Sequence, residues 1–160
     1  MNQTLALNLF EYVNGELFWK NPSNPKRIAK GDKAGTVSKR GYVHVQVYGK
    51  IYKAHQLVFL MMHGYIPKLI DHINGVLTDN RIENLREASV SENQQNAKTR
   101  ADNSSGVKNV SWHRRLCKWT VQLSFKGKVK HFGNFADLEL AALVAEEARN
   151  KYYGQFARHG

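Results

Sequence analysis

The residues with the clearest potential for chemistry are Asp71 and His72, an aspartate directly followed by a histidine. Asparagines follow them along the chain, among them Asn84 and Asn93. Aspartate and asparagine oxygens are hard ligands of the kind that Mg²⁺ or Mn²⁺ takes, with water completing the shell. A histidine titrates near neutral pH and can take a proton from water. These residue types are what the hydrolysis of a phosphodiester with one divalent metal ion requires.

The order of these residues assigns them different roles. Successive residues of a strand point to opposite faces, so a strand through this pair would put a metal ligand on one side and a base on the other. We therefore expect Asp71 and Asn93 to hold one ion per active site and His72 to be the general base. The uncharged Asn84 is expected to hydrogen-bond the loop and fix the geometry of His72. The alternative is an ordinary turn whose amide side chains cap the backbone. Each residue taken alone favours this alternative, whereas the residues taken together favour a nuclease site.

The surrounding sequence predicts a strand, a turn, a second strand and a helix. Leu69-Ile70 leads into the strand, and Asn74-Gly75 marks the turn. Ser89 and Glu92 form a capping box, which predicts a helix from Ser89 to about Lys98. Together these elements make a ββα unit.

The chain upstream predicts elements that would support this unit. Asn14-Gly15 predicts a two-residue hairpin turn, and period-two alternation predicts another hairpin over 41–52. A short helix is expected over 54–62, closed by Gly64. His55 at its start is either a metal ligand or, as is commoner, a hydrogen-bonded core residue.

The segments 71–75, 79–86 and 91–96 resemble the HNH endonucleases of phages and mobile introns. The segment 53–58 resembles the helix that leads into the motif in that family, and the likeness covers roughly residues 8–98. The resemblance implies a ββα-metal nuclease module. It also implies cleavage that leaves 3′-hydroxyl and 5′-phosphate ends, as in a free-standing homing endonuclease of a phage or related element.

The resemblance assigns the same residues the same roles. It makes His72 the general base, Asn84 the middle structural asparagine, and Asp71 and Asn93 the metal ligands. Asn93 stands where histidine is common in the wider family, so the chain resembles the H-N-N variant. This difference favours magnesium over zinc or nickel.

A second, smaller pattern follows a stretch without large apolar residues. Alternation over 119–125 predicts a strand, and Asp137 is expected to cap a helix that Gly154 ends. We expect a three-stranded antiparallel sheet packed on one helix, with its other face polar and basic. The predicted division is a nuclease domain at 1–98, a linker at 99–105 and a DNA-binding domain at 106–160, giving an α+β fold overall.

Polar and basic residues of this second pattern are expected to contact phosphates and base edges of DNA. The residues are Lys108, Arg114, Arg115, Gln122, Ser124, Lys126, Lys128 and Lys130. The alternative is a basic face that is merely solvated.

Residues 106 to about 157 resemble the Apetala2-type domain. The likeness rests on Gly106-Val107, Trp112, Lys118-Trp119, 132–135 and Ala141-Ala142. The resemblance implies a sheet laid in the major groove. The DNA-contacting positions that it implies are Lys108, Trp112, Gln122, Ser124 and His131.

Composition favours a nucleic-acid partner. Twenty-four Lys and Arg against 13 Asp and Glu give a net charge of +11, which attracts a polyanion in a salt-dependent manner. The single cysteine, Cys117, excludes an intramolecular disulfide framework and a Cys-Cys zinc site. The longest apolar run, 57–62, is too short to span a bilayer, and the start lacks a signal peptide's basic stretch. We expect a cytoplasmic protein, in the host cell if phage-encoded, that acts on double-stranded DNA.

These observations favour a metal-dependent DNA endonuclease that is a monomer or weak dimer, without a membrane or small-molecule partner. One rival is a non-catalytic DNA-binding regulator built on the same scaffold, in which His72 or Asp71 would be lost. A second rival is RNA binding by exposed aromatic residues, which the core-facing parity of Trp119 opposes.

Overall fold

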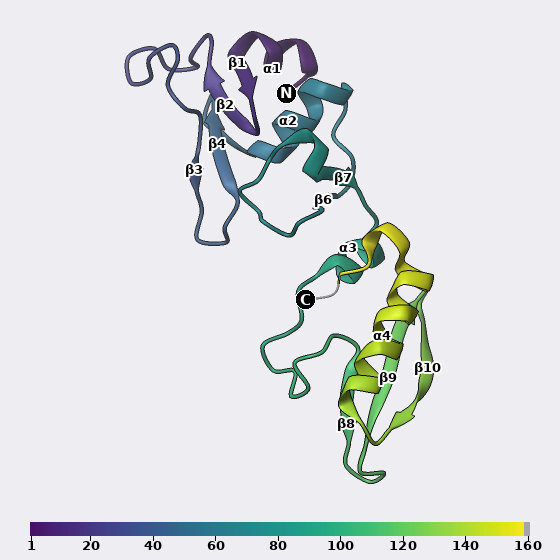
Figure 1. Cartoon of the computed structure of the whole chain (residues 1–160). Coiled ribbons are helices and arrows are strands. Elements are labelled where there is room, and N and C mark those ends of the chain that lie inside the picture. The colour runs from purple at the N-terminus through teal and green to yellow at the C-terminus, as the bar shows by residue number, and fades with distance from the viewer. Residues whose placement is uncertain (159–160) are drawn as a thin grey trace. The chain divides into compact units, whose positions relative to one another are not determined.

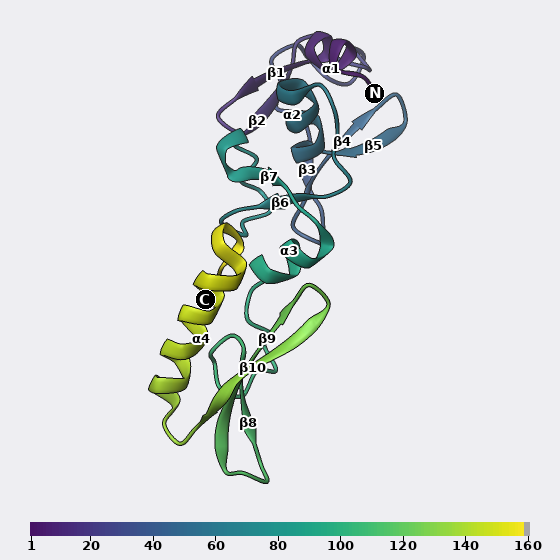
Figure 2. The same cartoon turned by 90° about the vertical axis from the view of Figure 1, so that its right-hand side faces the viewer.

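A computed structural model describes residues 1–158 of the chain. The chain forms two compact units, Met1–Ala88 and Ser89–Gly160, each with its own apolar core. Figure 1 and Figure 2 show the elements of each unit. The boundary between the two units lies ten residues before the predicted end of the nuclease domain, so the helix with Asn93 belongs to the second unit. The functional division into domains stays a prediction.

The first unit contains three small antiparallel sheets, β1-β2, β3-β4-β5 and β6-β7, together with two helices and a 3-10 turn. Its elements are α1 (Gln3–Leu9), β1 (Phe10–Val13), β2 (Glu16–Trp19), β3 (Thr36–Val37), β4 (Val43–Val47), β5 (Lys50–Lys53), α2 (Ala54–His63), β6 (Ile70–His72), η1 (Ile82–Asn84) and β7 (Leu85–Glu87).

Turn residues set the path of the first unit. Asn14 and Gly15 both have positive φ, of 46° and 88°, which is the backbone that a tight hairpin requires. A Cβ on Gly15 would lie 2.8 Å from the backbone nitrogen of Arg81, so this turn approaches the loop before η1. Gly64 has φ 82° and ends α2, as the sequence predicted.

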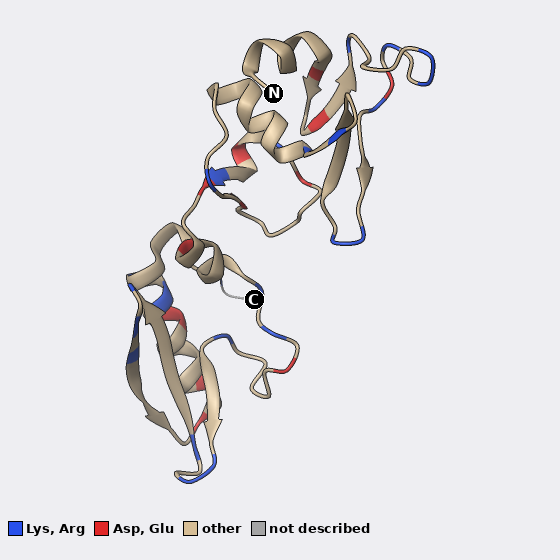
Figure 3. Cartoon of the chain, turned by 180° about the vertical axis from the view of Figure 1, so that it is seen from behind, with Lys and Arg blue, Asp and Glu red and all other residues tan. Residues whose placement is uncertain are grey.

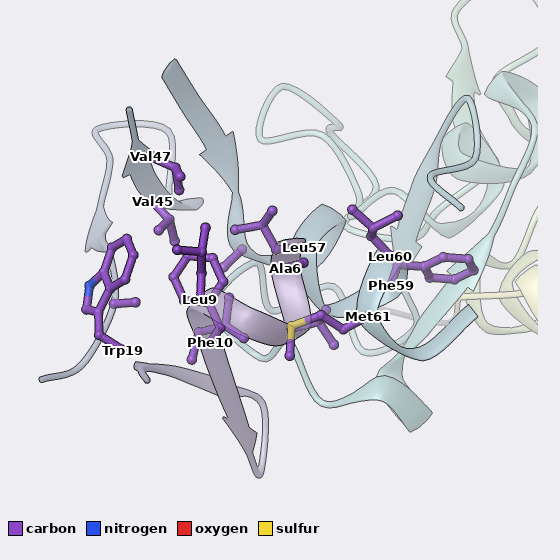
Figure 4. Packing of buried hydrophobic residues seen from close by; sticks show 14 of the residues in the cluster. Ala6, Leu9, Phe10, Trp19, Val45, Val47, Leu57, Phe59, Leu60 and Met61 are labelled. Atoms are coloured by element: carbon purple, nitrogen blue, oxygen red, sulfur yellow. The ribbon is translucent and has the colours of Figure 1, made fainter. Parts of the chain in front are cut away.

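The core of the first unit lies between α2 and the strands (Figure 4). Leu57 of α2 and Val45 of β4 are fully buried, together with Leu9 and Phe10 at the α1–β1 junction. Because α2 is buried along most of its length, its first turn is fixed. That turn carries His55 toward β6.

The second unit consists of one three-stranded antiparallel sheet, in the order β10-β9-β8, and helices beside it. Its elements are α3 (Val90–Asn96), β8 (Val110–His113), β9 (Lys118–Phe125), β10 (Lys128–Phe135), α4 (Leu138–Tyr153) and η2 (Gly154–Phe156).

The apolar core of the second unit lies between the sheet and α4. Val121 and Leu123 of β9 are buried in one cluster with the small residues Ala141 and Ala145 of α4. The Asp137 side chain caps α4 by accepting from the Leu140 N–H at 2.7 Å. The expected small sheet and single long helix are therefore present.

The elements of the expected ββα unit occur in the expected order. β6 pairs with β7, and α3 begins after Ser89 with a complete capping box. Because α3 belongs to the second unit, the ββα-metal arrangement itself stays a prediction. Within residues 1–158, no helix is both long and apolar enough to cross a membrane.

The burial of α2 predicts a large stability difference between two positions on this helix. Leu57→Ala removes a fully buried side chain and should lower the free energy of unfolding by about 2–5 kcal/mol. Met62→Ala, at a position 42% exposed on the same helix, should change it by less than about 0.5 kcal/mol. Urea unfolding followed by circular dichroism measures both. Equal effects would contradict the described core.

Candidate active site

His72 is held in a defined orientation at the end of β6. Its side chain is buried, and its Nε2 lies 3.1 Å from Oδ1 of Asn80. Asn80 in turn donates from Nδ2 to the carbonyl oxygen of Thr78 at 3.3 Å, so its oxygen faces the imidazole. An amide oxygen only accepts, so Nε2 carries the proton and donates. The neutral ring therefore has its basic lone pair on Nδ1.

The surroundings keep the His72 imidazole uncharged. Burial lowers the pKa of His72, because the charged ring loses its hydration. The hydrogen bond to Asn80 and the nearby carboxylates of Asp71 and Asp79 act in the opposite direction, with smaller effect. The lowered pKa leaves His72 neutral at pH 7, which is the form that accepts a proton.

Aromatic rings line the same place. The His55 ring stands edge-on to His72, with centroids 5.0 Å apart, and Tyr42 lies 5.4 Å from His55. Burial lowers the pKa of His55 to about 3, helped by His72, Lys53 and His44. His55 is thus a neutral, buried ring that packs against His72. Of the two readings that the sequence left open, this geometry favours the core residue.

Asp71, next to His72, is buried and paired with an arginine. Arg86 faces it across the β6–β7 ladder and donates to Oδ2 from Nε at 2.9 Å and from a terminal nitrogen at 2.7 Å. Both side chains are almost withdrawn from water, at 12% and 6% exposure. The arginine therefore compensates the charge of the buried carboxylate.

Asn84 holds the loop that follows His72. Its Oδ1 accepts from the Asn74 N–H at 3.0 Å, and its Nδ2 donates to the Asn74 side chain and to the Asp79 carbonyl. Asp79 is fixed by Arg81, which donates to both carboxylate oxygens and lowers the pKa of Asp79 well below its usual range. Asn84 therefore joins residues 74 and 79 of the loop by hydrogen bonds, and its role in the active site stays a prediction.

The structure brings Asp71, His72 and Asn84 together in the first unit and places Asn93 in the second. Asn93 lies in α3 and is half-buried. Among residues 1–158, no group of three or more His, Cys, Asp or Glu side chains is arranged to hold a metal ion. The donor set of Asp71 and Asn93, one charged oxygen and one amide oxygen, nevertheless fits a hard ion that keeps several waters.

Part of the expected DNA-binding set lies on the open face of the second sheet. Val121 and Leu123 face α4, so Gln122 and Ser124, between and beside them, point the other way and are exposed. His131 is the cross-strand partner of Gln122 and shares its face. These three residues therefore form one surface.

Other members of that set lie on the helix side. Trp112 is the cross-strand partner of Trp119, and Lys130 is the cross-strand partner of Leu123. Cross-strand partners share a face of the sheet, so Trp112 and Lys130 are on the side of α4. The Lys130 ammonium lies over the Tyr152 ring, 4.3 Å from its centroid. The structure does not bring Trp112 and Lys130 to the open face.

The remaining basic residues are at the two hairpin turns. Arg114 and Arg115 are exposed in the turn between β8 and β9, and Figure 3 shows the positive charge gathered there. Lys126 occupies the turn between β9 and β10 with φ 50°, and Lys128 begins β10. Contact of these turns with DNA stays a prediction.

Lys108 has a partner inside the protein. Its ammonium donates to the carbonyl oxygens of Gln95 and Ala97 at the end of α3. Burial, with Arg149 nearby, lowers the pKa of Lys108 to about 8. This lysine is the least accessible to phosphate of the expected set.

Two residues that organise the site received no role from the sequence. Asn80 lies eight positions after His72 in a loop without regular structure, so only the folded loop shows the contact. Arg86 becomes a partner of Asp71 once the β6–β7 register is known. Most of the loop around Asn80 is exposed, although Asn80 itself is buried, so no sequence pattern marked these two roles.

Comparisons with known proteins identify a family for part of the chain. A family model described as HNH endonuclease matches residues 52–95, which include β6, β7 and α3. Protein 3.8 of Escherichia phage T7 is 37% identical over 116 residues, covering 69% of this chain and 95% of that protein. No solved structure matches the chain significantly. On these grounds residues 52–95 are an HNH endonuclease domain, and the chain is related to the phage protein over most of that protein's length.

Proposed function

We propose that this protein is a DNA endonuclease that hydrolyses a phosphodiester bond with one divalent metal ion and with His72 as general base. The observation that carries the proposal is the buried, neutral His72, held through Nε2 by Asn80 and adjacent to the buried Asp71. HNH nucleases generally use a divalent metal ion and act on DNA, which agrees with the match over residues 52–95.

The orientation of His72 assigns the proton transfer to one atom. Nδ1 takes a proton from a water molecule while the water oxygen attacks phosphorus. The bond from phosphorus to the 3′ oxygen then breaks, and the leaving oxygen takes a proton from solvent water, which yields a 3′-hydroxyl and a 5′-phosphate. Asn80 holds the ring throughout and accepts from Nε2–H more strongly once the ring is charged.

The metal ligands in this proposal are Asp71 and Asn93, and the ion is Mg²⁺ or Mn²⁺. When bound, such an ion supplies stabilisation of the negative charge that develops on the phosphate and the leaving oxygen. Asn84 has a supporting role, because it closes the loop that contains Asn80.

The second unit is proposed to dock the nuclease on duplex DNA as an Apetala2-like module. Its exposed Arg114 and Arg115 supply phosphate contacts, and Gln122 and His131 lie on the open face where base edges would be read. The biological role proposed is that of a free-standing phage homing endonuclease.

One observation favours a second candidate function, a DNA-binding regulator without catalysis. Asp71 is already neutralised by Arg86, as a scaffold that needs no metal would arrange it. Retention of duplex DNA without cleavage would favour this candidate.

Cleavage of supercoiled plasmid and phage DNA tests the proposal. With magnesium the protein should nick or linearise the DNA, and EDTA should stop it. His72→Ala should slow the reaction roughly 10²- to 10⁴-fold, because it removes the general base. Lys68→Ala, at an exposed position of the same unit, is the control. Cleavage that persists in His72→Ala would reject His72 as the base.

The contact between Asn80 and His72 predicts a matched pair of variants. Asn80→Leu removes the acceptor and should lower kcat roughly 10- to 100-fold, as losses of histidine-orienting partners do. Asn80→Asp keeps an acceptor at the same place and should retain several times more activity than Asn80→Leu. Single-turnover rates at saturating DNA measure the difference. Equal rates in the two variants would show that the hydrogen bond does not orient the base.

The arginine turn predicts a change in salt dependence. Arg114→Gln and Arg115→Gln together should reduce the slope of log affinity against log salt by roughly 2, since each phosphate contact contributes about 0.9. Filter binding of a short duplex to the full chain in EDTA gives this slope. Lys151→Gln, which removes one positive charge from α4 instead of from this turn, is the control. An unchanged slope in the double variant would remove this turn from the DNA interface.

A further inference from the structure

Helix α3, which carries Asn93, needs support from outside itself. It has seven residues, and an isolated helix of this length is unstable in water. Its first turn is closed by the capping box, in which Ser89 Oγ accepts from the Glu92 N–H at 3.2 Å and Glu92 accepts from the Ser89 N–H at 2.7 Å. The carbonyl groups of its last turn require other partners.

Lys108 provides those partners. Its ammonium donates to the carbonyl oxygens of Gln95 and Ala97, where the negative end of the helix dipole also favours a cation. The Lys108 backbone is fixed as well, because its carbonyl accepts from Arg149 Nη1 at 2.6 Å. Arg149 is 2% exposed in the middle of the α4 packing surface. A continuous set of contacts therefore runs from α4 through Lys108 to the end of α3.

The side of α3 that faces the sheet is not the side that carries Asn93. Ser91, Gln94 and Gln95 line the same hollow as Gln122 and Ser124 of β9. At 100° per residue, Asn93 is rotated by roughly 200° from Ser91 and thus projects away from that hollow. The residues of α3 that line the hollow and Asn93 are therefore on different faces of the helix.

We propose that Lys108 is a positioning residue for Asn93, which ties the helix bearing this metal ligand to the sheet and helix of the second unit. Lys108 does not touch DNA in this role. The inference rests on the proposed function in so far as Asn93 is a metal ligand. It gives Lys108 a different task from the phosphate contact that the sequence predicted.

Hydrogen exchange of the full chain, without metal or DNA, tests the tie itself. Lys108→Met removes the donor and should speed the exchange of amides in the last turn of α3 at least tenfold. Lys108→Arg keeps a cationic donor and should restore slow exchange. Lys151→Met removes an equal charge from an exposed position and should change nothing in α3. Unchanged exchange in Lys108→Met would overturn the proposal.

The metal requirement tests the consequence for Asn93. Lys108→Met should raise the magnesium concentration for half-maximal cleavage several-fold, in the same direction as Asn93→Ala. Retention of duplex DNA in EDTA should equal that of Lys151→Met, at an exposed lysine outside the expected DNA-contacting set. DNA retention could instead fall as much as cleavage does while the magnesium requirement stays unchanged. That result would show that Lys108 contacts phosphate and would overturn the proposal.

Two further comparisons distinguish failure of this proposal from misfolding of Lys108→Met and from failure of the proposed function. Ser89→Ala removes the cap at the other end of α3 and leaves Lys108 in place, so it should raise the magnesium requirement even where Lys108→Met does not fold. An unchanged requirement in Ser89→Ala would then overturn the proposal. If the unaltered protein cleaves no DNA, the proposed function fails, whereas the exchange experiment still decides whether Lys108 holds α3.

Discussion

The burial of Asp71 and His72 side by side on β6 is the constraint on which the first unit depends. A buried carboxylate requires an opposite charge, and a buried imidazole requires a hydrogen-bond partner. Arg86 meets the first requirement from β7, and Asn80 meets the second from the loop. That loop has no regular structure of its own, so Asn84 must hold it with three hydrogen bonds.

The same burial sets the chemistry of the site. In water His72 would be partly protonated near neutral pH, whereas withdrawal from water lowers its pKa and keeps it a base. The neighbouring His55 reinforces this environment because its own pKa, about 3, prevents a second charge from forming there. The burial that positions the imidazole thus also keeps it neutral, which is the form that can accept a proton.

Features encoded by short stretches of sequence could be predicted, and those that depend on tertiary contacts could not. The Asn14-Gly15 turn, the end of α2 at Gly64 and the capping box at Ser89 follow from local backbone rules and are present. Helix α1 begins after the capping residue Asn2, a local signal from which we did not predict a helix. The partners of His72 and Lys108 lie eight and more residues away, so only the fold brings them together. The expected roles of Asp71 and Asn93 toward a metal stay predictions for the same reason.

The pairing of Asp71 with Arg86 is compatible with both a nuclease and a scaffold, and the physical argument favours the nuclease. A scaffold gains little from a buried ion pair, because apolar residues of similar size would be at least as stable there. A metal site, in contrast, needs its carboxylate in place before the ion arrives, and an unpaired buried carboxylate would be costly. Arg86 removes that cost by donating to Oδ2 from Nε and from a terminal nitrogen. We therefore interpret the ion pair as holding the Asp71 carboxylate in place beside His72, where the proposed metal ion would bind.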